Sequence, residues 1–156
     1  MSASAHPNIF PALRYQNATA AAEWLTRAFG FTEKAVYRDD DGVVRHAELR
    51  LGAGIVMFGQ HNEDGWMGGK PPDPLASPIS MYVVVDDVDA HNRRAVAAGA
   101  EIVRDLADMD YGSREYSARD LEGNLWSFGT YDPYQPEQPE QPEQPEQPAK
   151  PAGGAA

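Results

Sequence analysis

The 156-residue sequence contains no cysteine. This absence excludes disulfide bonds, thiolate metal sites and a cysteine nucleophile, and it fits a reducing compartment such as the cytosol. No apolar run approaches the roughly 18 residues of a membrane span. The segment from Met1 to Pro7 also lacks the basic start and apolar stretch of a secretory signal. Together these absences predict a cytoplasmic protein.

Positive charge is scarce, because 13 Lys and Arg stand against 24 Asp and Glu, for a net charge of −11. The segment after Tyr134 holds four Glu and one Lys, so it accounts for −3 and leaves the preceding part at −8. An acidic protein argues against nucleic acid and membrane surfaces as partners and is compatible with a cationic ligand. Solubility alone is the simpler explanation of the charge.

The C-terminal segment is a repeat of Pro-Glu-Gln that runs from Gln135 to Pro148. Such a composition cannot bury a core, and its prolines favour an extended polyproline II conformation. We therefore predict one domain over residues 8–134 and a disordered tail over 135–156.

Two similar modules, residues 8–60 and 79–132, are predicted within the domain, joined by the Gly- and Pro-rich loop 61–78. Alternating and helical hydrophobic periodicities predict the order strand, helix and three strands in each. The predicted strands cover 9–15, 33–38, 44–51 and 55–60 in the first module, and 79–85, 102–106, 114–119 and 125–131 in the second.

The helix ends carry recognisable signals. Asn17 and Asp87 are predicted N-caps of helices that run to Phe29 and Ala98, and a glycine follows each helix. At an offset of 70 residues the two halves share several identities, which together with the matching order of elements indicate an internal duplication. These pairs include Ile9/Ile79, Ala20/Ala90, Ala28/Ala98, Asp40/Asp110, Gly42/Gly112, Leu51/Leu121, Phe58/Phe128 and Gly59/Gly129.

The segment YGSREY at 111–116, followed by RDLEGNL at 119–125, carries a family resemblance. It is similar to the "YG-x-REF…DP-x-GN" hairpin of the bleomycin-resistance branch of the vicinal-oxygen-chelate superfamily, with Leu121 in place of the usual proline. This superfamily includes glyoxalases, bleomycin-resistance proteins and extradiol dioxygenases. The resemblance implies an α+β fold of two tandem βαβββ modules that form a cupped mixed sheet, but the fold hosts many chemistries.

The resemblance also implies where a metal would be held. Metal-dependent members take one ligand from the first and one from the last strand of each module, and those positions match Phe10, Met57, Ser80 and Ser127. None of these residue types is a good ligand, so we expect no metal, no cofactor and no metal-dependent catalysis.

A different metal site is conceivable at His46 and Glu48, which share a strand face, with Glu115 or His61 as a third ligand. A hydrogen-bonded pair that lines a wet cleft is the favoured interpretation, because an isolated H-x-E on a strand is not a metal signature. His91 is expected on a solvated helix face.

Strand alternation assigns residues to the predicted cleft. Trp126 and Phe128 are assigned to the helix side, as core, and Ala118 to the cleft. Trp66 lies on the long loop, which is either a lid or a simple linker. The predicted ligand-binding residues are Phe10, Arg14, His46, Glu48, Arg50, Met57, Trp66, Ser80, Tyr82, Tyr116 and Ser127.

These residues predict a metal-independent, homodimeric protein that binds a small molecule, an aromatic or cationic drug or metabolite that it sequesters. The alternative is a metal-dependent lyase, isomerase or dioxygenase of the same superfamily. A third hypothesis is a metal-free enzyme with Glu48 or His46 as general base.

Overall fold

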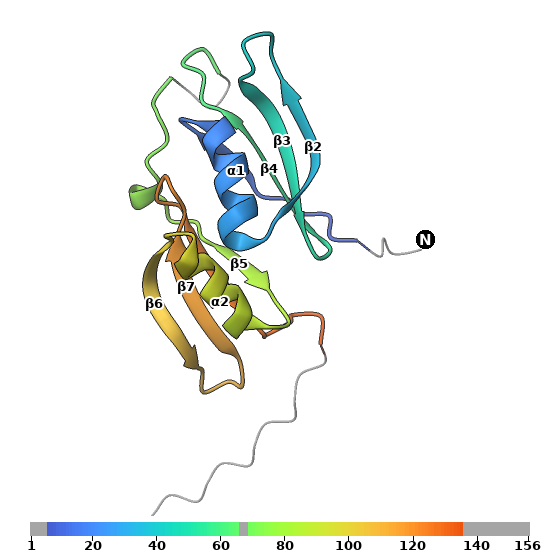
Figure 1. The fold of residues 1–156 in the computed structure, drawn as a ribbon, viewed down its shortest axis with the longest axis vertical. Helices are drawn as coiled ribbons and strands as arrows, with labels where there is room; N and C mark the ends of the chain where they lie inside the picture. Colours follow the sequence, from blue (N-terminus) through green and yellow to red (C-terminus); the bar gives the residue numbers. More distant parts are fainter. Residues whose placement is uncertain (1–5, 66–68, 136–156) are drawn as a thin grey trace, which may run out of the picture.

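Two copies of one element order make up the fold, as the sequence predicts (Figure 1). The computed structural model describes residues 6–65 and 69–135. A short 3-10 helix, η1 (Pro74–Ala76), lies between the modules. The first module comprises β1 (Ala12–Tyr15), α1 (Ala18–Phe29), β2 (Thr32–Arg38), β3 (Val44–Leu51) and β4 (Gly54–Gln60); the second comprises β5 (Met81–Val84), α2 (Val88–Ala97), β6 (Glu101–Asp108), β7 (Arg114–Arg119) and β8 (Leu125–Gly129).

Each module forms its own four-stranded mixed sheet, with the strand order β1-β4-β3-β2 in the first and β5-β8-β7-β6 in the second. The first strand of each module pairs in parallel with the last strand, and the other pairs are antiparallel. The parallel pair requires a crossover, and the helix of the module supplies it.

The helices begin and end at the predicted signals. The side chains of Asn17 and Asp87 accept hydrogen bonds from the backbone N–H three residues ahead, each at 3.0 Å. Gly30 ends α1 in the left-handed region at φ 79°, which a residue with a Cβ adopts only at a cost. Local sequence chemistry therefore accounts for both helix starts.

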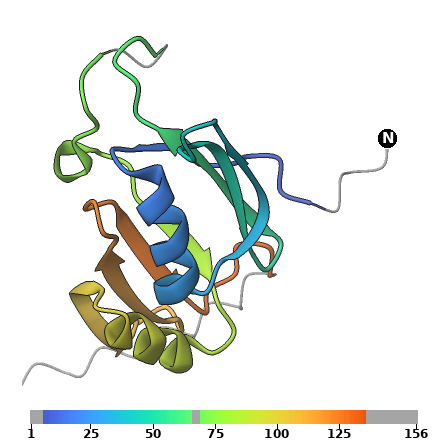
Figure 2. The same ribbon diagram turned by 45° about the horizontal axis from the view of Figure 1, so that its top comes forward.

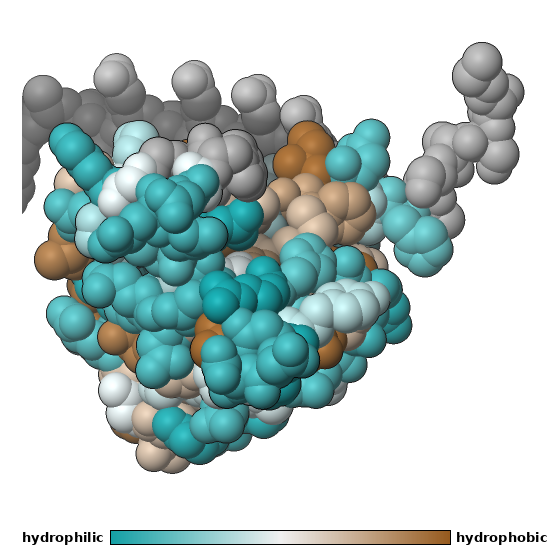
Figure 3. Space-filling model, turned by 90° about the horizontal axis from the view of Figure 1, so that it is seen from above, coloured by the Kyte–Doolittle hydropathy of each residue, from teal (hydrophilic) through white to brown (hydrophobic). Residues whose placement is uncertain are grey.

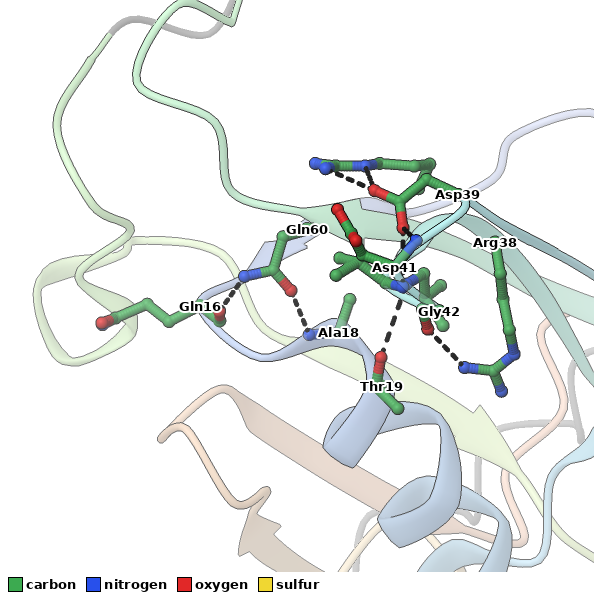
Figure 4. Close-up of polar contacts among 11 residues, drawn as sticks. Gln16, Ala18, Thr19, Arg38, Asp39, Asp41, Gly42 and Gln60 are labelled. Carbon is green, nitrogen blue, oxygen red and sulfur yellow. Dashed lines mark hydrogen bonds and ion pairs between the residues drawn. The ribbon is translucent and has the colours of Figure 1, made fainter.

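A polar network holds the N-terminus of α1 against the first sheet (Figure 4). The Gln60 side chain accepts a hydrogen bond from the Ala18 N–H at 2.9 Å and donates one to the Gln16 carbonyl. In the β2–β3 turn, Asp39 accepts from the N–H groups of Asp41 and Val43. The acidic run at 39–41 thus forms the β2–β3 hairpin turn.

The two helices lie between the two sheets and join them through one core (Figure 2). Phe29 at the end of α1 packs against Trp126 and Phe128 of β8, with ring centroids 5.7 and 4.7 Å apart. Trp126 and Phe128 are buried, which confirms their predicted place in the core. Because both sheets turn their helix-bearing faces toward this core, their opposite faces point outward.

His91 belongs to this junction, and its predicted place on a solvated helix face is wrong. Its Nε2 lies 2.7 Å from the Phe29 carbonyl oxygen and its Nδ1 lies 2.6 Å from the Tyr116 hydroxyl. Arg94, one turn later, donates to the carbonyls of Thr26 and Arg27. Helix α2 therefore satisfies carbonyl groups that α1 leaves unpaired at its C-terminus.

The β7–β8 hairpin ties the second module to the first through Asp120, which is buried. Its carboxylate accepts hydrogen bonds from the Tyr15 hydroxyl at 2.6 Å and from the Trp126 indole N–H at 3.1 Å. Glu122 accepts from the backbone N–H groups of Gln16 and Asn17. The acidic residues of the RDLEGNL segment thus hold the two modules together.

Candidate functional site

The face of each sheet opposite its helix, here called the open face, carries the residues available to a ligand. In the first module one cross-strand row on this face is formed by residues in direct register, namely Ala12, Met57, Glu48 and Ala35. Ala47 and Leu49 alternate with Glu48 and are buried against the helix side. The prediction that His46 and Glu48 share the face away from the helix is confirmed.

Glu48 is the centre of a charged chain on this open face. Its carboxylate accepts a hydrogen bond from Lys34 at 2.7 Å and lies 3.2 Å from His46 Nε2. The hydrogen bond from Lys34, followed by that from His46, lowers the pKa of Glu48. A lower pKa makes Glu48 a weaker general base, which counts against this residue in the metal-free enzyme hypothesis.

Three further predicted binding residues, Phe10, Arg14 and Arg50, lie on or beside the strands of the first module. Phe10 precedes β1 and is exposed, and Arg50 is an exposed residue opposite Ile55. Arg14 donates to the Leu13 carbonyl at 2.9 Å. The predicted binding residue Trp66 lies outside the described residues.

In the second module the corresponding row on the open face runs across all four strands. Tyr82 of β5 is in register with Ser127 of β8, Ser127 with Ser117 of β7, and Ser117 with Arg104 of β6. The two serine hydroxyl oxygens are 2.7 Å apart. Tyr82 and Ser127 therefore lie where predicted, whereas Ser80 is exposed just before β5.

The prediction that Tyr116 and Ala118 lie on this face is wrong. They are directly opposite Phe128 and Trp126 in the antiparallel β7–β8 pair, and directly opposite residues share a face. Both are fully buried on the helix side. The pKa of Tyr116 is raised by this burial.

A β-bulge explains the error. In the first module Arg38 pairs with Val44 but Tyr37 pairs with His46, so Arg45 has no partner. In the second module Asp108 pairs with Arg114 and Ala107 with Glu115, without an extra residue. The offset between the modules therefore falls from 70 to 69 within β7, and a slip of one residue exchanges the two faces.

Glu115 consequently occupies the open face, and sequence reasoning missed it as a binding residue. Its side chain is only 5% exposed. One carboxylate oxygen accepts a hydrogen bond from Arg104 at 2.9 Å, and the other accepts one from the Tyr111 hydroxyl at 2.8 Å. Glu115 pairs with Gly129 of β8, and this pairing puts it on the open face. A constant offset of 70 between the modules does not reveal this pairing.

Gly129 makes room for this arrangement. A Cβ at this position would lie 2.6 Å from both Glu115 Cγ and the Tyr82 hydroxyl oxygen. Tyr82 donates from that hydroxyl to the Tyr131 carbonyl at 2.9 Å. A residue without a side chain therefore lets a carboxylate and a tyrosine approach each other across β8.

Tyrosine rings surround Glu115 and remain accessible. Tyr82 is 39% and Tyr111 is 59% exposed. Tyr111 and Tyr131 meet edge to face, with centroids 6.3 Å apart. The hydrogen bond to Glu115 raises the pKa of Tyr111, and burial raises the pKa of Tyr82, so both hydroxyls stay protonated at neutral pH. The second open face thus combines accessible rings with a sequestered carboxylate.

The positions matched to the family's metal ligands can be located in this frame. Met57 and Ser127 lie at the centres of the two open faces, and the residues opposite them on the first strands are Ala12 and Tyr82. Glu115 lies on the open face of the second module, whereas His46 and Glu48 lie on that of the first. Within one chain Glu115 is therefore not a third metal ligand beside them. Over residues 6–65 and 69–135, no three or more His, Cys, Asp or Glu residues gather as a metal site.

The molecular surface is mainly hydrophilic on the side seen in Figure 3, with smaller hydrophobic areas between polar ones. Within the described chain, no helix combines the length and apolar character needed to cross a membrane. The hydrophilic surface on this side suits the acidic composition.

Comparison with known proteins identifies the family. The Glyoxalase/Bleomycin resistance protein/Dioxygenase superfamily matches residues 8–128, so the chain belongs to this superfamily. An uncharacterized protein of Mycobacterium bovis is 33% identical over 134 residues, which cover 83% of this chain and 86% of the relative. An uncharacterized protein of Mycobacterium tuberculosis is also 33% identical, and the match covers 77% of its length.

Solved structures confirm the fold. TioX from Micromonospora sp. ML1 is 37% identical with a TM-score of 0.64, over 79% of this chain and 94% of TioX. A bleomycin-binding protein, crystallised in complex with bleomycin, is 20% identical with a TM-score of 0.59, over 81% of this chain and 99% of its own. Because the bleomycin-binding protein is only 20% identical, its similarity supports the fold and not a shared function.

Proposed function

We propose that this chain binds a small aromatic or cationic molecule without a resident metal ion, and that it sequesters this drug or metabolite rather than converting it. Glu115 carries the proposal, because it is a nearly buried carboxylate among accessible tyrosine rings. Burying a charged group costs free energy of solvation, and sites that combine such groups with apolar surface are typical of ligand binding. The neighbour crystallised with bleomycin supports a small molecule as the ligand class.

We further propose a homodimer. The open faces of the two modules point away from each other within one chain, so one site that uses both faces needs a second copy. The binding residues would then be Phe10, Arg14, His46, Glu48, Arg50 and Met57 from one chain and Tyr82, Arg104, Tyr111, Glu115, Ser117 and Ser127 from the other. Light scattering that gives a clean 17.0 kDa species at micromolar concentration would contradict the dimer.

A thermal-shift screen tests the proposed binding. A ligand present at 100 times its Kd stabilises the folded state by about 2.7 kcal/mol, which corresponds to a rise of several degrees. We expect the rise to be lost in Glu115→Gln and kept in Glu23→Gln, which changes an exposed carboxylate of α1 outside the proposed site. Equal responses of the two variants would contradict the role of Glu115.

Metal analysis separates this proposal from a metal-dependent enzyme, for which the proximity of His46 and Glu48 is the best support. We expect protein purified without chelator to contain far less than one transition-metal ion per chain. One zinc, iron, nickel or manganese ion per chain that disappears in His46→Ala would favour the lyase, isomerase or dioxygenase alternative.

A further inference from the structure

We propose that the second module's open face selects a neutral aromatic ligand that carries a hydrogen-bond donor and a hydrogen-bond acceptor at opposite ends of its ring. This inference rests on the proposed function and narrows its ligand class. It follows from the charge balance of the face, from an unused hydroxyl proton, and from unused acceptor positions on Glu115.

The charges on this face balance each other. Two adjacent rows cross the sheet, Tyr82–Ser127–Ser117–Arg104 and Val84–Gly129–Glu115–Ala107. Glu115 and Arg104 are the charged residues of these rows, and they are bonded to each other at 2.9 Å. A cationic ligand would compete with Arg104 for the Glu115 carboxylate and add a positive charge beside it, whereas a neutral ligand leaves the ion pair intact.

The serine pair leaves one donor unused. Each hydroxyl has a single proton, so only one of Ser117 and Ser127 can donate across their 2.7 Å contact. Neither hydroxyl has a second partner among residues 6–65 and 69–135. Since Ser117 is buried and Ser127 half-buried, the remaining proton gains most from an acceptor on a ligand.

Glu115 leaves acceptor capacity unused. A carboxylate has about four lone-pair positions, and the bonds from Arg104 and Tyr111 occupy two of them. Glu115 and Ser117 are two residues apart on β7 and share a face, which sets their spacing at about 6.6 Å. A ligand ring that lies along β7 against Tyr82 can therefore place a donor at Glu115 and an acceptor at the serines.

Four small probes test this inference by NMR titration of the full chain. 4-Hydroxyacetophenone carries both groups, 4-methoxyacetophenone lacks the donor, 4-ethylphenol lacks the acceptor, and tyramine carries a positive charge. We expect 4-hydroxyacetophenone to bind tightest, with each missing group weakening binding about five- to tenfold.

Variants assign the two contacts. Ser117→Ala should remove the preference for the acetyl over the ethyl group, and Glu115→Gln should reduce the preference for hydroxyl over methoxy. Glu23→Gln, which changes an exposed carboxylate of α1 outside the proposed site, should leave both preferences unchanged.

The outcomes distinguish the inference from the function on which it rests. Equal affinities for all four probes at this face, or tightest binding by tyramine, would overturn the inference and leave the binding function standing. Failure of every probe to shift the resonances of Tyr82, Ser117 and Tyr111 would count against the binding function as well.

Discussion

The two modules share their element order and strand order, yet they hold a carboxylate on the open face in different ways. Glu48 in the first module is 23% exposed at its side chain and bonded to a lysine and a histidine. Glu115 in the second is 5% exposed and bonded to an arginine and a tyrosine. The same backbone frame therefore supports a hydrated charge in one module and a sequestered charge in the other.

The largest difference in stability between equivalent mutations in the two modules is expected in the hairpin turns, β2–β3 and β7–β8. Asp39 and Asp120 each accept hydrogen bonds from the N–H groups two and four residues ahead. Only Asp120 also accepts from the buried Tyr15 and Trp126 side chains. Because each buried donor left unpaired costs about 1–3 kcal/mol, we expect Asp120→Ala to lower the free energy of unfolding by about 3 kcal/mol or more.

Urea unfolding of both alanine variants measures this contrast. Asp39→Ala serves as the control, since it removes the same backbone contacts from an exposed turn and should cost less. Equal losses in the two variants would show that Asp120 does not connect the modules.

The two equivalent strand glycines should respond less strongly and in different ways. A Cβ on Gly59 would lie 2.3 Å from the Arg45 carbonyl oxygen, a backbone atom at the bulge. We expect Gly59→Ala to cost about 2 kcal/mol, because the backbone must move. Gly129→Ala meets side chains instead, so it should cost less stability but displace Glu115 and Tyr82 and weaken ligand binding. Unfolding and binding measured on both variants test this, and a reversed order would contradict it.

A smaller effect, on the pH dependence of stability, should come from His91 of α2. The equivalent position of α1 is Ala21, which cannot titrate. Burial, the largest cause, lowers the pKa of His91 below its usual value. Its stabilising contribution is therefore full above the unfolded-state pKa of about 6.5 and is lost as pH falls toward the lower folded-state value.

Unfolding at pH 7.5 and 5.5 tests this effect. The unmodified chain should lose more stability on acidification than His91→Gln, which lacks the titrating ring. Carboxylates with lowered pKa values, such as Glu48, lose their contribution only near or below pH 4, outside this interval. If both proteins lost the same stability between pH 7.5 and 5.5, His91 would not be the cause of the loss.

The smallest effect is expected from the Pro-Glu-Gln tail. Truncation after Tyr134 should leave the melting temperature within about one degree, because we expect no packed surface to be lost. A fall of about 5 °C, of the order that 1 kcal/mol produces, would show that the tail docks on one of the modules.

Much of the fold could be predicted from the sequence. The bounds of β3 and β7, the caps Asn17 and Asp87, and the core positions of Trp126 and Phe128 agree with the structure. The binding face of β7 could not be predicted from a constant offset, because the bulge at Arg45 leaves no clear mark in the residue pattern.

The sequence by itself determined the order of elements, the helix ends and the duplicated frame, because these depend on periodicity and capping over a few residues. The tertiary structure alone decided that Glu115 is sequestered beside Arg104, that Asp120 joins the modules and that His91 lies at their junction. Each of these depends on strand register or on contacts between distant segments. A one-residue change in pairing reverses such contacts without altering the local pattern.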